Sequence, residues 1–191
     1  MKDRYKTYVK CIGAVAVVVF LVIKGIWREI EFGDALSYAT TITTVLVVAY
    51  TTFFWRYNPL EKTPKLKKQY TGTLISTYDN KERDVDIKIK QSLFETKVEF
   101  QSGESSSVSI TSNFYDEFGE IKLSFGYINN PKAIYKDRSP IHYGMCIFKI
   151  KDADHLEGQY FTDRNTRGDI KLTSLECVDR SKKEKEEIKI E

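Results

Sequence analysis

The chain opens with two long apolar stretches separated by a short polar connection. Residues 11–23 carry no charge and are bracketed by Lys10 and Lys24, and residues 35–55 are also uncharged. A membrane-spanning helix needs about 20 apolar residues, and lysine amines can reach the headgroups from within a span. The pattern therefore predicts spans over residues 9–27 and 35–55. The first stretch could instead be a cleaved signal peptide, but no small-residue cleavage site follows it and a second span does.

The basic residues around these spans predict their orientation. Lysines and arginines are frequent in residues 1–10 and 56–68, whereas the connection 28–34 has one arginine against three acidic residues. Because basic flanks stay on the cytoplasmic side, we expect both chain ends in the cytoplasm. We interpret residues 1–57 as a two-helix transmembrane region and residues 58–69 as a basic linker that touches anionic headgroups.

The second span is unusually rich in hydroxyl side chains. Four of them recur at the spacing i, i+3, i+4 and i+7, which is one helical face: Ser37, Thr40, Thr41 and Thr44. Beside them lies a row of small residues: Ala35, Ala39 and Thr43. Such faces let helices approach closely. Packing against the first span and self-association of several chains both remain open.

From residue 70 onward the polar and apolar positions alternate with a period of two, which is typical of β-strands. We expect strands over 73–78, 84–90, 96–100, 108–110, 121–125, 144–148, 156–161 and 168–175, with turns at 79–80, 102–103, 118–119, 129–131, 152–154 and 165. We expect no helix between residues 70 and 178. A closed sheet leaves no exposed edge, so the pattern predicts an all-β antiparallel barrel of about eight strands over residues 70–178. A β-sandwich is the alternative. Residues 179–191 form a charged tail or short helix.

Composition and motifs give no positive indication of an enzyme, since the sequence has no P-loop, GxSxG, HExxH or Rossmann glycine pattern. Of 191 residues, 30 are Lys or Arg and 27 are Asp or Glu, and the part after residue 69 has a net charge of −3, with 19 basic and 22 acidic residues. That balance does not favour a DNA or RNA polymer as partner. The three cysteines are far apart and the two histidines, His142 and His155, belong to no recognisable catalytic or metal motif. We read both as surface or turn residues, and expect no enzyme, cofactor or metal.

One stretch, residues 156–172, stands out in the barrel region. Gly158 and Gly168 lie in predicted strands, where glycine indicates close approach of another group. Between them the polar hairpin 162–167 holds two arginines and two threonines, which could bind a phosphate. Aromatic residues nearby could stack on a base. The alternative is a structural hairpin in which Asp163 pairs with an arginine.

The two spans, the barrel and this stretch together resemble the two-transmembrane, β-strand-rich effectors of bacterial CBASS anti-phage operons. The likeness covers nearly the whole chain. Its motif has the form G-x-Y-F-x-D-R-x-T-x-G, and the matching positions are Gly158, Tyr160, Phe161, Asp163, Arg164, Thr166 and Gly168.

The resemblance implies a cytoplasmic barrel that binds a cyclic dinucleotide made by a partner synthase. Binding would drive homo-oligomerisation, and the clustered spans would disrupt the bacterial inner membrane and kill the infected cell. On this hypothesis Arg164, Arg167 and Thr166 contact phosphate, and Tyr160, Tyr78 and Tyr115 contact bases. The hydroxyl face of Ser37, Thr40, Thr41 and Thr44 is then the seam between subunits.

Two other classes remain possible from the sequence. A membrane-tethered, lipocalin-like carrier of an apolar ligand would have an apolar barrel lining without arginines. A membrane-anchored hydrolase or transferase would have two carboxylates converging at the barrel mouth.

Overall fold

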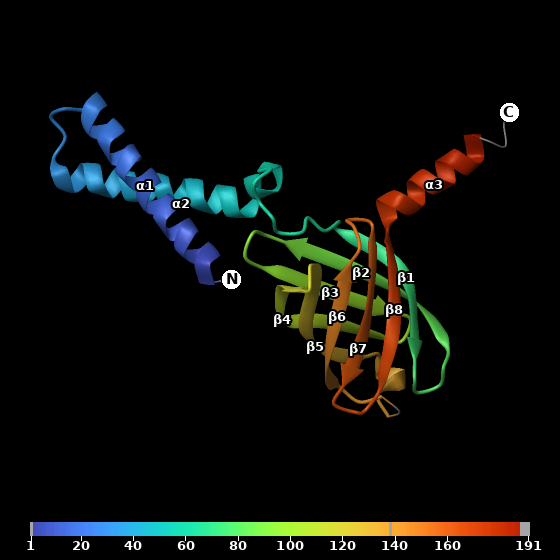
Figure 1. Ribbon diagram of the computed structural model, residues 1–191. Coiled ribbons are helices and arrows are strands. Elements are labelled where there is room, and N and C mark those ends of the chain that lie inside the picture. The colour runs from blue at the N-terminus through green and yellow to red at the C-terminus, as the bar shows by residue number, and fades with distance from the viewer. Residues whose placement is uncertain (1, 138, 188–191) are drawn as a thin grey trace. The chain divides into compact units, whose positions relative to one another are not determined.

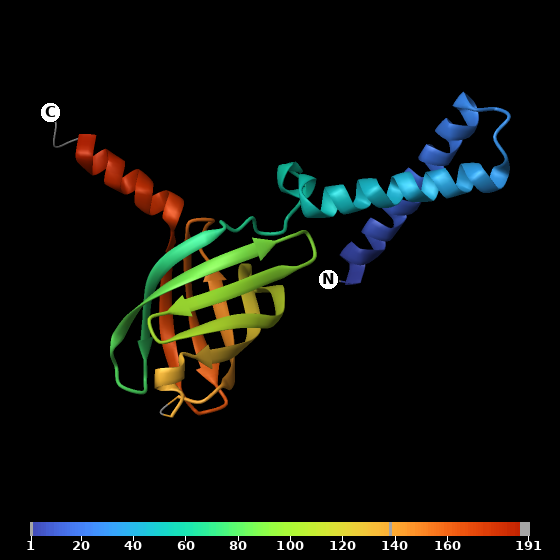
Figure 2. The ribbon, with the colours of Figure 1, turned by 180° about the vertical axis from the view of Figure 1, so that it is seen from behind.

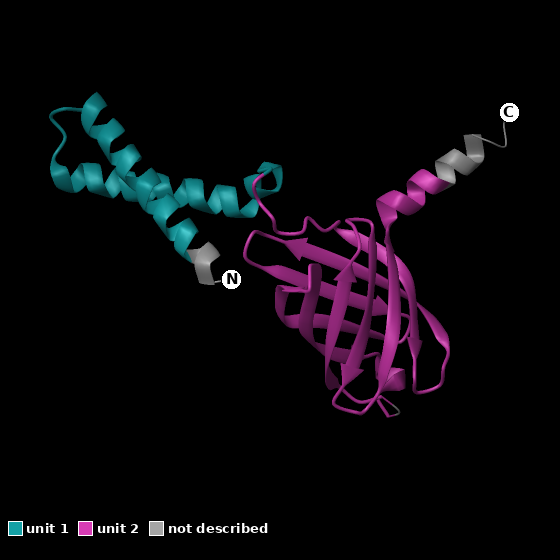
Figure 3. Ribbon diagram, viewed as in Figure 1, with its two compact units in different colours: residues 1–59 teal, residues 60–191 magenta. Residues whose placement is uncertain are grey.

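A computed structural model of the protein describes residues 2–137 and 139–187. It divides into two units, Met1–Pro59 and Leu60–Glu191 (Figure 3). The first unit holds helices α1 (Lys2–Ile26) and α2 (Phe32–Thr52), followed by the short 3₁₀ helix η1 (Phe54–Tyr57). Both long helices are long and apolar enough to cross a membrane, so the predicted pair of apolar helices is confirmed.

Helices α1 and α2 pack through small side chains. Ala35 and Ala39 of α2 are buried against Ile23 of α1, with Val19 and Phe20 beside them. Small residues allow two helix backbones to approach closely. The row Ala35, Ala39 and Thr43 therefore serves packing inside one chain, since all three residues are buried.

The hydroxyl face of α2 remains exposed in the single chain. The Oγ1 atoms of Thr40, Thr41 and Thr44 each donate a hydrogen bond to the carbonyl four residues earlier, at 2.8, 3.0 and 2.9 Å. Because these hydroxyl protons are already bonded within the helix, the face tolerates lipid without a partner.

The second unit is a closed barrel whose eight strands follow the chain order, each antiparallel to the next, with β8 paired to β1 (Figures 1 and 2). The strands are β1 (Gln69–Ser76), β2 (Glu82–Gln91), β3 (Thr96–Ser102), β4 (Ser105–Glu117), β5 (Glu120–Pro131), β6 (His142–Ile150), β7 (His155–Thr162) and β8 (Arg167–Ser174). The short helix η2 (Ala133–Tyr135) lies between β5 and β6. The predicted antiparallel barrel is confirmed.

One end of the barrel is filled, and we call it the closed end. It is the end where the chain enters β1 and leaves β8. Leu66, from the segment before β1, is fully buried in the core with Tyr70 and Phe148. The Tyr70 hydroxyl donates to the Ala153 carbonyl at 2.7 Å and accepts from the Lys67 backbone N–H at 2.9 Å. The entering segment thus plugs this end.

Several predicted boundaries are wrong. The expected strand 108–110 is part of the 13-residue β4, and the expected turn 129–131 is the paired end of β5. A helix, α3 (Leu175–Glu187), also begins before residue 178. It starts there because the Ser174 Oγ accepts the Cys177 backbone N–H at 3.2 Å, a helix N-cap. The predicted charged tail is therefore mostly helix, and residues 188–191 lie outside the described residues.

Candidate ligand-binding site

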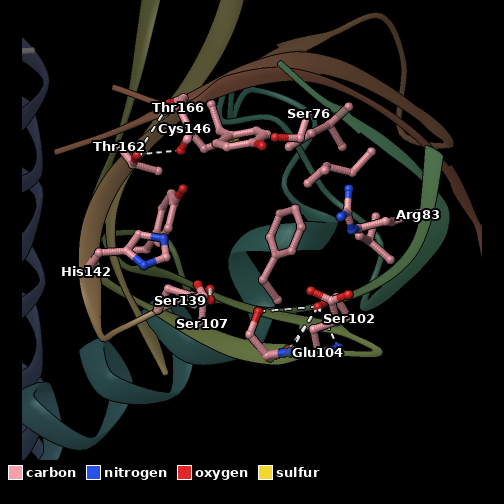
Figure 4. A pocket seen from close by; sticks show the side chains of 18 of the residues that line it. Ser76, Arg83, Ser102, Glu104, Ser107, Ser139, His142, Cys146, Thr162 and Thr166 are labelled. Atoms are coloured by element: carbon pink, nitrogen blue, oxygen red, sulfur yellow. Dashed lines mark hydrogen bonds between the residues drawn. The ribbon is translucent and has the colours of Figure 1, made fainter. Parts of the chain in front are cut away.

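The other end of the barrel is hollow, and we call it the open end. It is formed by the β1–β2, β3–β4 and β7–β8 turns and by the connection from β5 to β6. A cavity of about 190 Å³ lies here, and every strand contributes inward side chains to it (Figure 4). Tyr78 at the rim is 71% exposed, so the cavity opens to solvent.

Two glycines let tyrosine rings at this end lie close against the barrel wall. A Cβ atom built on Gly144 would lie 2.4 Å from the Tyr127 ring, and one built on Gly168 would lie 2.6 Å from the Tyr160 ring. Each ring therefore rests against backbone that has no side chain, along the wall of the barrel. An eight-strand barrel has just enough interior to be filled by side chains, so rings held against the wall leave room for a small ligand.

Arg83 places a positive charge on the inner wall. It lies on the same face of β2 as the buried Val85, Ile87 and Ile89. Its guanidinium donates to both carboxylate oxygens of Asp79, at 2.9 and 2.7 Å. This hydrogen bonding lowers the pKa of the Asp79 carboxyl to about 2 and raises the pKa of Arg83.

The β7–β8 turn adds a second cation. Arg164 lines the cavity and donates from Nη1 to the Ser139 hydroxyl at 3.0 Å. Beneath it the hydroxyls of Thr162 and Thr166 lie 2.7 Å apart. Asn165 adopts a left-handed backbone conformation, φ 58°, which closes this tight turn.

The floor of the cavity is uncharged. Burial raises the pKa of the Cys146 thiol and of the Tyr127 and Tyr160 hydroxyls. A buried thiol that stays protonated is a poor nucleophile. The cavity thus combines two arginines and the carboxylate of Glu104 with neutral polar and aromatic groups. The arginines can bind a small anion, and the aromatic rings can contact flat groups on it.

Four of the six predicted ligand-binding residues line this cavity: Arg164, Thr166, Tyr160 and Tyr78. The structure does not bring Arg167 and Tyr115 to it. Arg167 is exposed on β8, whose inward positions begin with the buried Gly168 and Ile170. Tyr115 lies near the far end of β4, opposite Lys122 and towards the closed end.

Sequence reasoning missed several lining residues, among them Arg83, Asn129 and His142. Arg83 could have been found from the sequence. It lies an even number of residues before three apolar residues of β2, and therefore on the same, inward face of that strand. The sequence predicts a surface or turn position for His142, but the side chain points into the cavity (Figure 4). His155 is exposed beside Asp152, with 3.0 Å between Nδ1 and Oδ1, and does not line the cavity.

The residues that line the cavity also bear on the two alternative classes, an apolar-ligand carrier and a membrane-anchored hydrolase or transferase. Two arginines do not suit a carrier of an apolar ligand. Within the described part of the chain, Glu104 is the single carboxylate that lines the cavity, so the paired carboxylates that would favour a hydrolase are not found there. The described residues also hold no group of three or more His, Cys, Asp or Glu that could bind a metal ion.

A small closed barrel with one filled end and one polar, hollow end defines a receptor for a small ligand. Residues 61–174 match the family model described as "Cap15, cyclic dinucleotide receptor domain". The chain is also 30% identical over 183 residues to CD-NTase-associated protein 15 of Staphylococcus schleiferi, over 92% of this chain and 100% of that protein. The chain therefore belongs to the Cap15 family, the cyclic dinucleotide receptors associated with CBASS, as the resemblance implied.

Proposed function

We propose that this protein is a membrane-anchored CBASS effector whose open end binds a cyclic dinucleotide made by a partner synthase, and that it is not an enzyme. The main support for this proposal is a polar cavity with two arginines, at one end of a barrel that matches the receptor family. Arginine suits phosphate because its planar fork of N–H groups matches two phosphate oxygens.

The ligand's parts correspond to groups in the cavity. Arg83 of β2 and Arg164 of the β7–β8 turn can each meet one phosphate, with the Thr166 hydroxyl in the same turn as Arg164. Tyr160 and the rim residue Tyr78 offer ring faces for the bases. A cavity of about 190 Å³ is smaller than most pockets for drug-sized ligands. We therefore expect part of the ligand to remain at the mouth.

Binding would act through assembly of several chains in the inner membrane, with both chain ends in the cytoplasm. A ligand shifts this equilibrium only if it binds the assembled state more tightly than the single chain. The hydroxyl face of α2 is the proposed seam, because Thr40, Thr41 and Thr44 are exposed whereas the small-residue row is already used against α1. Clustered spans would then disrupt the bilayer and end the infection by cell death.

The binding half of this proposal is tested by calorimetry on the full chain in detergent, with a panel of cyclic di- and trinucleotides. We expect micromolar or tighter binding of one member, about −8 kcal/mol. Arg164→Ala should weaken it at least tenfold, because a charge-assisted hydrogen bond is lost. Arg167→Ala is the matched control and should leave affinity unchanged. Failure of every panel member to bind would overturn the proposal.

The membrane half is tested by two substitutions on α2. Thr44→Trp places a bulky ring on the hydroxyl face, and Ile42→Trp places the same ring about 200° away around the helix. We expect Thr44→Trp to abolish ligand-induced oligomers and killing while ligand binding persists. Ile42→Trp should retain ligand-induced oligomers, killing and ligand binding. Equal behaviour of the two variants would contradict the proposed seam.

A further inference from the structure

A row of polar side chains crosses three neighbouring strands inside the open end. Ser107 of β4 is the register partner of Asn129 of β5, which is also the partner of His142 of β6. All three residues line the cavity (Figure 4 labels Ser107 and His142). Directly opposed residues on one face of a sheet have Cβ atoms about 4.5–5.5 Å apart, so Ser107 and His142 each lie next to Asn129.

Within the described part of the chain, the side-chain amide of Asn129 forms a hydrogen bond through its oxygen but not through its nitrogen. The residue is 6% exposed, and its Oδ1 accepts a hydrogen bond from the Ser107 hydroxyl at 2.7 Å. Its Nδ2 group carries two N–H donors, and no acceptor for them is found among the described residues. Among the described residues this nitrogen is not one of the fully buried atoms without a partner, so it is accessible from the cavity. It can therefore donate to an acceptor on a ligand there.

His142 supplies the complementary group. Its Nδ1 lies 2.9 Å from the Pro140 carbonyl oxygen, and because a carbonyl only accepts, Nδ1 carries the proton. In the neutral ring Nε2 is then an acceptor. The row therefore presents donors from Asn129 next to an acceptor from His142.

We infer that Ser107, Asn129 and His142 form the subsite that reads the hydrogen-bonding edge of one base of the ligand. This inference rests on the proposed function. The Watson–Crick edge of each base carries an acceptor next to a donor, which matches Asn129 and His142. Contacts to phosphate position a nucleotide but carry no information on its bases. The arginines therefore give affinity, and this row gives base preference.

A phosphate is a poorer occupant of the same row. The Asn129 donors could bond a phosphate oxygen, but the neighbouring Nε2 lone pair would face that negative charge. The Ser107–Asn129 bond by itself would serve only to link β4 to β5. That structural role uses the amide oxygen and leaves the amide nitrogen unexplained.

Asn129→Asp tests the inference because it replaces the donors by an acceptor and keeps Oδ1 for Ser107. Guanine has two adjacent donors on its Watson–Crick edge, N1–H and N2–H₂, and is the base best matched to the new carboxylate. The measurement is calorimetry of the full chain in detergent at pH 8 with cyclic di-AMP, di-GMP, di-UMP and di-CMP. We expect affinity for cyclic di-GMP to rise at least tenfold relative to the other three.

Two further variants keep the result interpretable. Asn129→Leu removes the donors without adding charge. It should weaken binding of the preferred ligand at least tenfold and make the affinities for the four cyclic dinucleotides more alike. Asn130→Asp makes the same change at the next residue of β5, whose side chain is exposed, and should leave the ranking unchanged. Thermal unfolding monitored by circular dichroism confirms that each variant is folded.

The outcomes separate the two proposals. If the wild-type chain binds and both Asn129 variants keep its ranking of the four ligands, the base-reading inference is wrong and the proposed function stands. If the wild-type chain binds none of the cyclic dinucleotides tested, the proposed function fails and this inference fails with it.

Discussion

The two ends of the barrel are built from the same eight strands and the same alternation, yet one is solid and the other hollow. At the closed end the inward positions hold large apolar side chains such as Leu66, Phe148 and Leu156, all fully buried. At the open end they hold polar side chains such as Ser107, Asn129 and Arg83. The size and polarity of inward residues, not the strand arrangement, separate the supporting end from the binding end.

This division separates stability from recognition. Apolar burial is the main favourable contribution to folding, at about 25 cal/mol per Å², and it is concentrated at the closed end. The polar groups at the open end add little to it, and Asn129 lacks a partner for its amide nitrogen among the described residues. The open end therefore has the character of a binding site prepared before its ligand arrives.

The largest predicted effect is on the free energy of unfolding, and it should differ between two inward phenylalanines, one at each end of the barrel. Phe148→Ala should lower the free energy of unfolding by about 3–5 kcal/mol, because it leaves a cavity in a filled core. Phe100→Ala should cost about half as much, because Phe100 is only partly buried and already borders the cavity. Chemical denaturation in detergent measures both. Equal losses would mean that the open end is packed as tightly as the closed end.

The next effect concerns affinity at the open end. Arg83→Met keeps much of the side-chain volume and removes the charge, so we expect cyclic dinucleotide affinity to fall about 10- to 100-fold, the loss of a charge-assisted hydrogen bond. The free energy of unfolding should change far less than in Phe148→Ala. Lys88→Met, on the outer face of the same strand, is the matched control. A similar loss of affinity in both variants would show that general charge, and not the cavity, attracts the ligand.

A smaller effect should follow from the partner of Arg83. Asp79 occupies two of the guanidinium donors, so a phosphate must share or displace it. Asp79→Asn removes the competing charge, and we expect ligand affinity to rise about twofold to fivefold, within the range of weak surface ion pairs. Calorimetry with the preferred ligand measures this change. A loss of affinity would show instead that Asp79 serves to hold Arg83 in place.

The smallest predicted effect is the pH dependence of stability that arises from the Asp79–Arg83 pair. The pKa of Asp79 is lowered from 3.8 to about 2 in the folded chain. A lowered pKa contributes stability that is complete above the unfolded value and is lost as pH falls through the folded value. We therefore expect a small loss of stability between about pH 4 and pH 2 in the wild-type chain, diminished in Asp79→Asn. Acid unfolding curves of identical shape would contradict this.

The fold was more predictable from sequence than the site. Residues 84–90 alternate so regularly that β2 and its buried face were predictable, and the uncharged stretches predicted both helices. The length of β4 was not, because its inward serines and exposed Val108 and Ile110 reverse the usual pattern. The reversal arises because β4 lines a polar cavity.

The site was only partly predictable because strand neighbours depend on register. Arg164, Thr166 and Tyr160 lie within one hairpin and could be found together from sequence. Arg83 and the row from Ser107 to His142 meet only once the barrel closes. Arg167 is exposed at the start of β8, whereas Arg164 lies in the β7–β8 turn and lines the cavity. Composition alone does not reveal this difference.

Hydrogen-exchange mass spectrometry of the full chain, with and without the preferred cyclic dinucleotide, tests most directly whether the open end is the ligand site. We expect slower exchange in four segments that surround the cavity: residues 77–83, 103–107, 139–146 and 160–166. Exchange at the closed end, in residues 92–95 and 116–121, should be unchanged. Protection confined to the closed end, or absent from the rim of the cavity, would show that the ligand binds elsewhere.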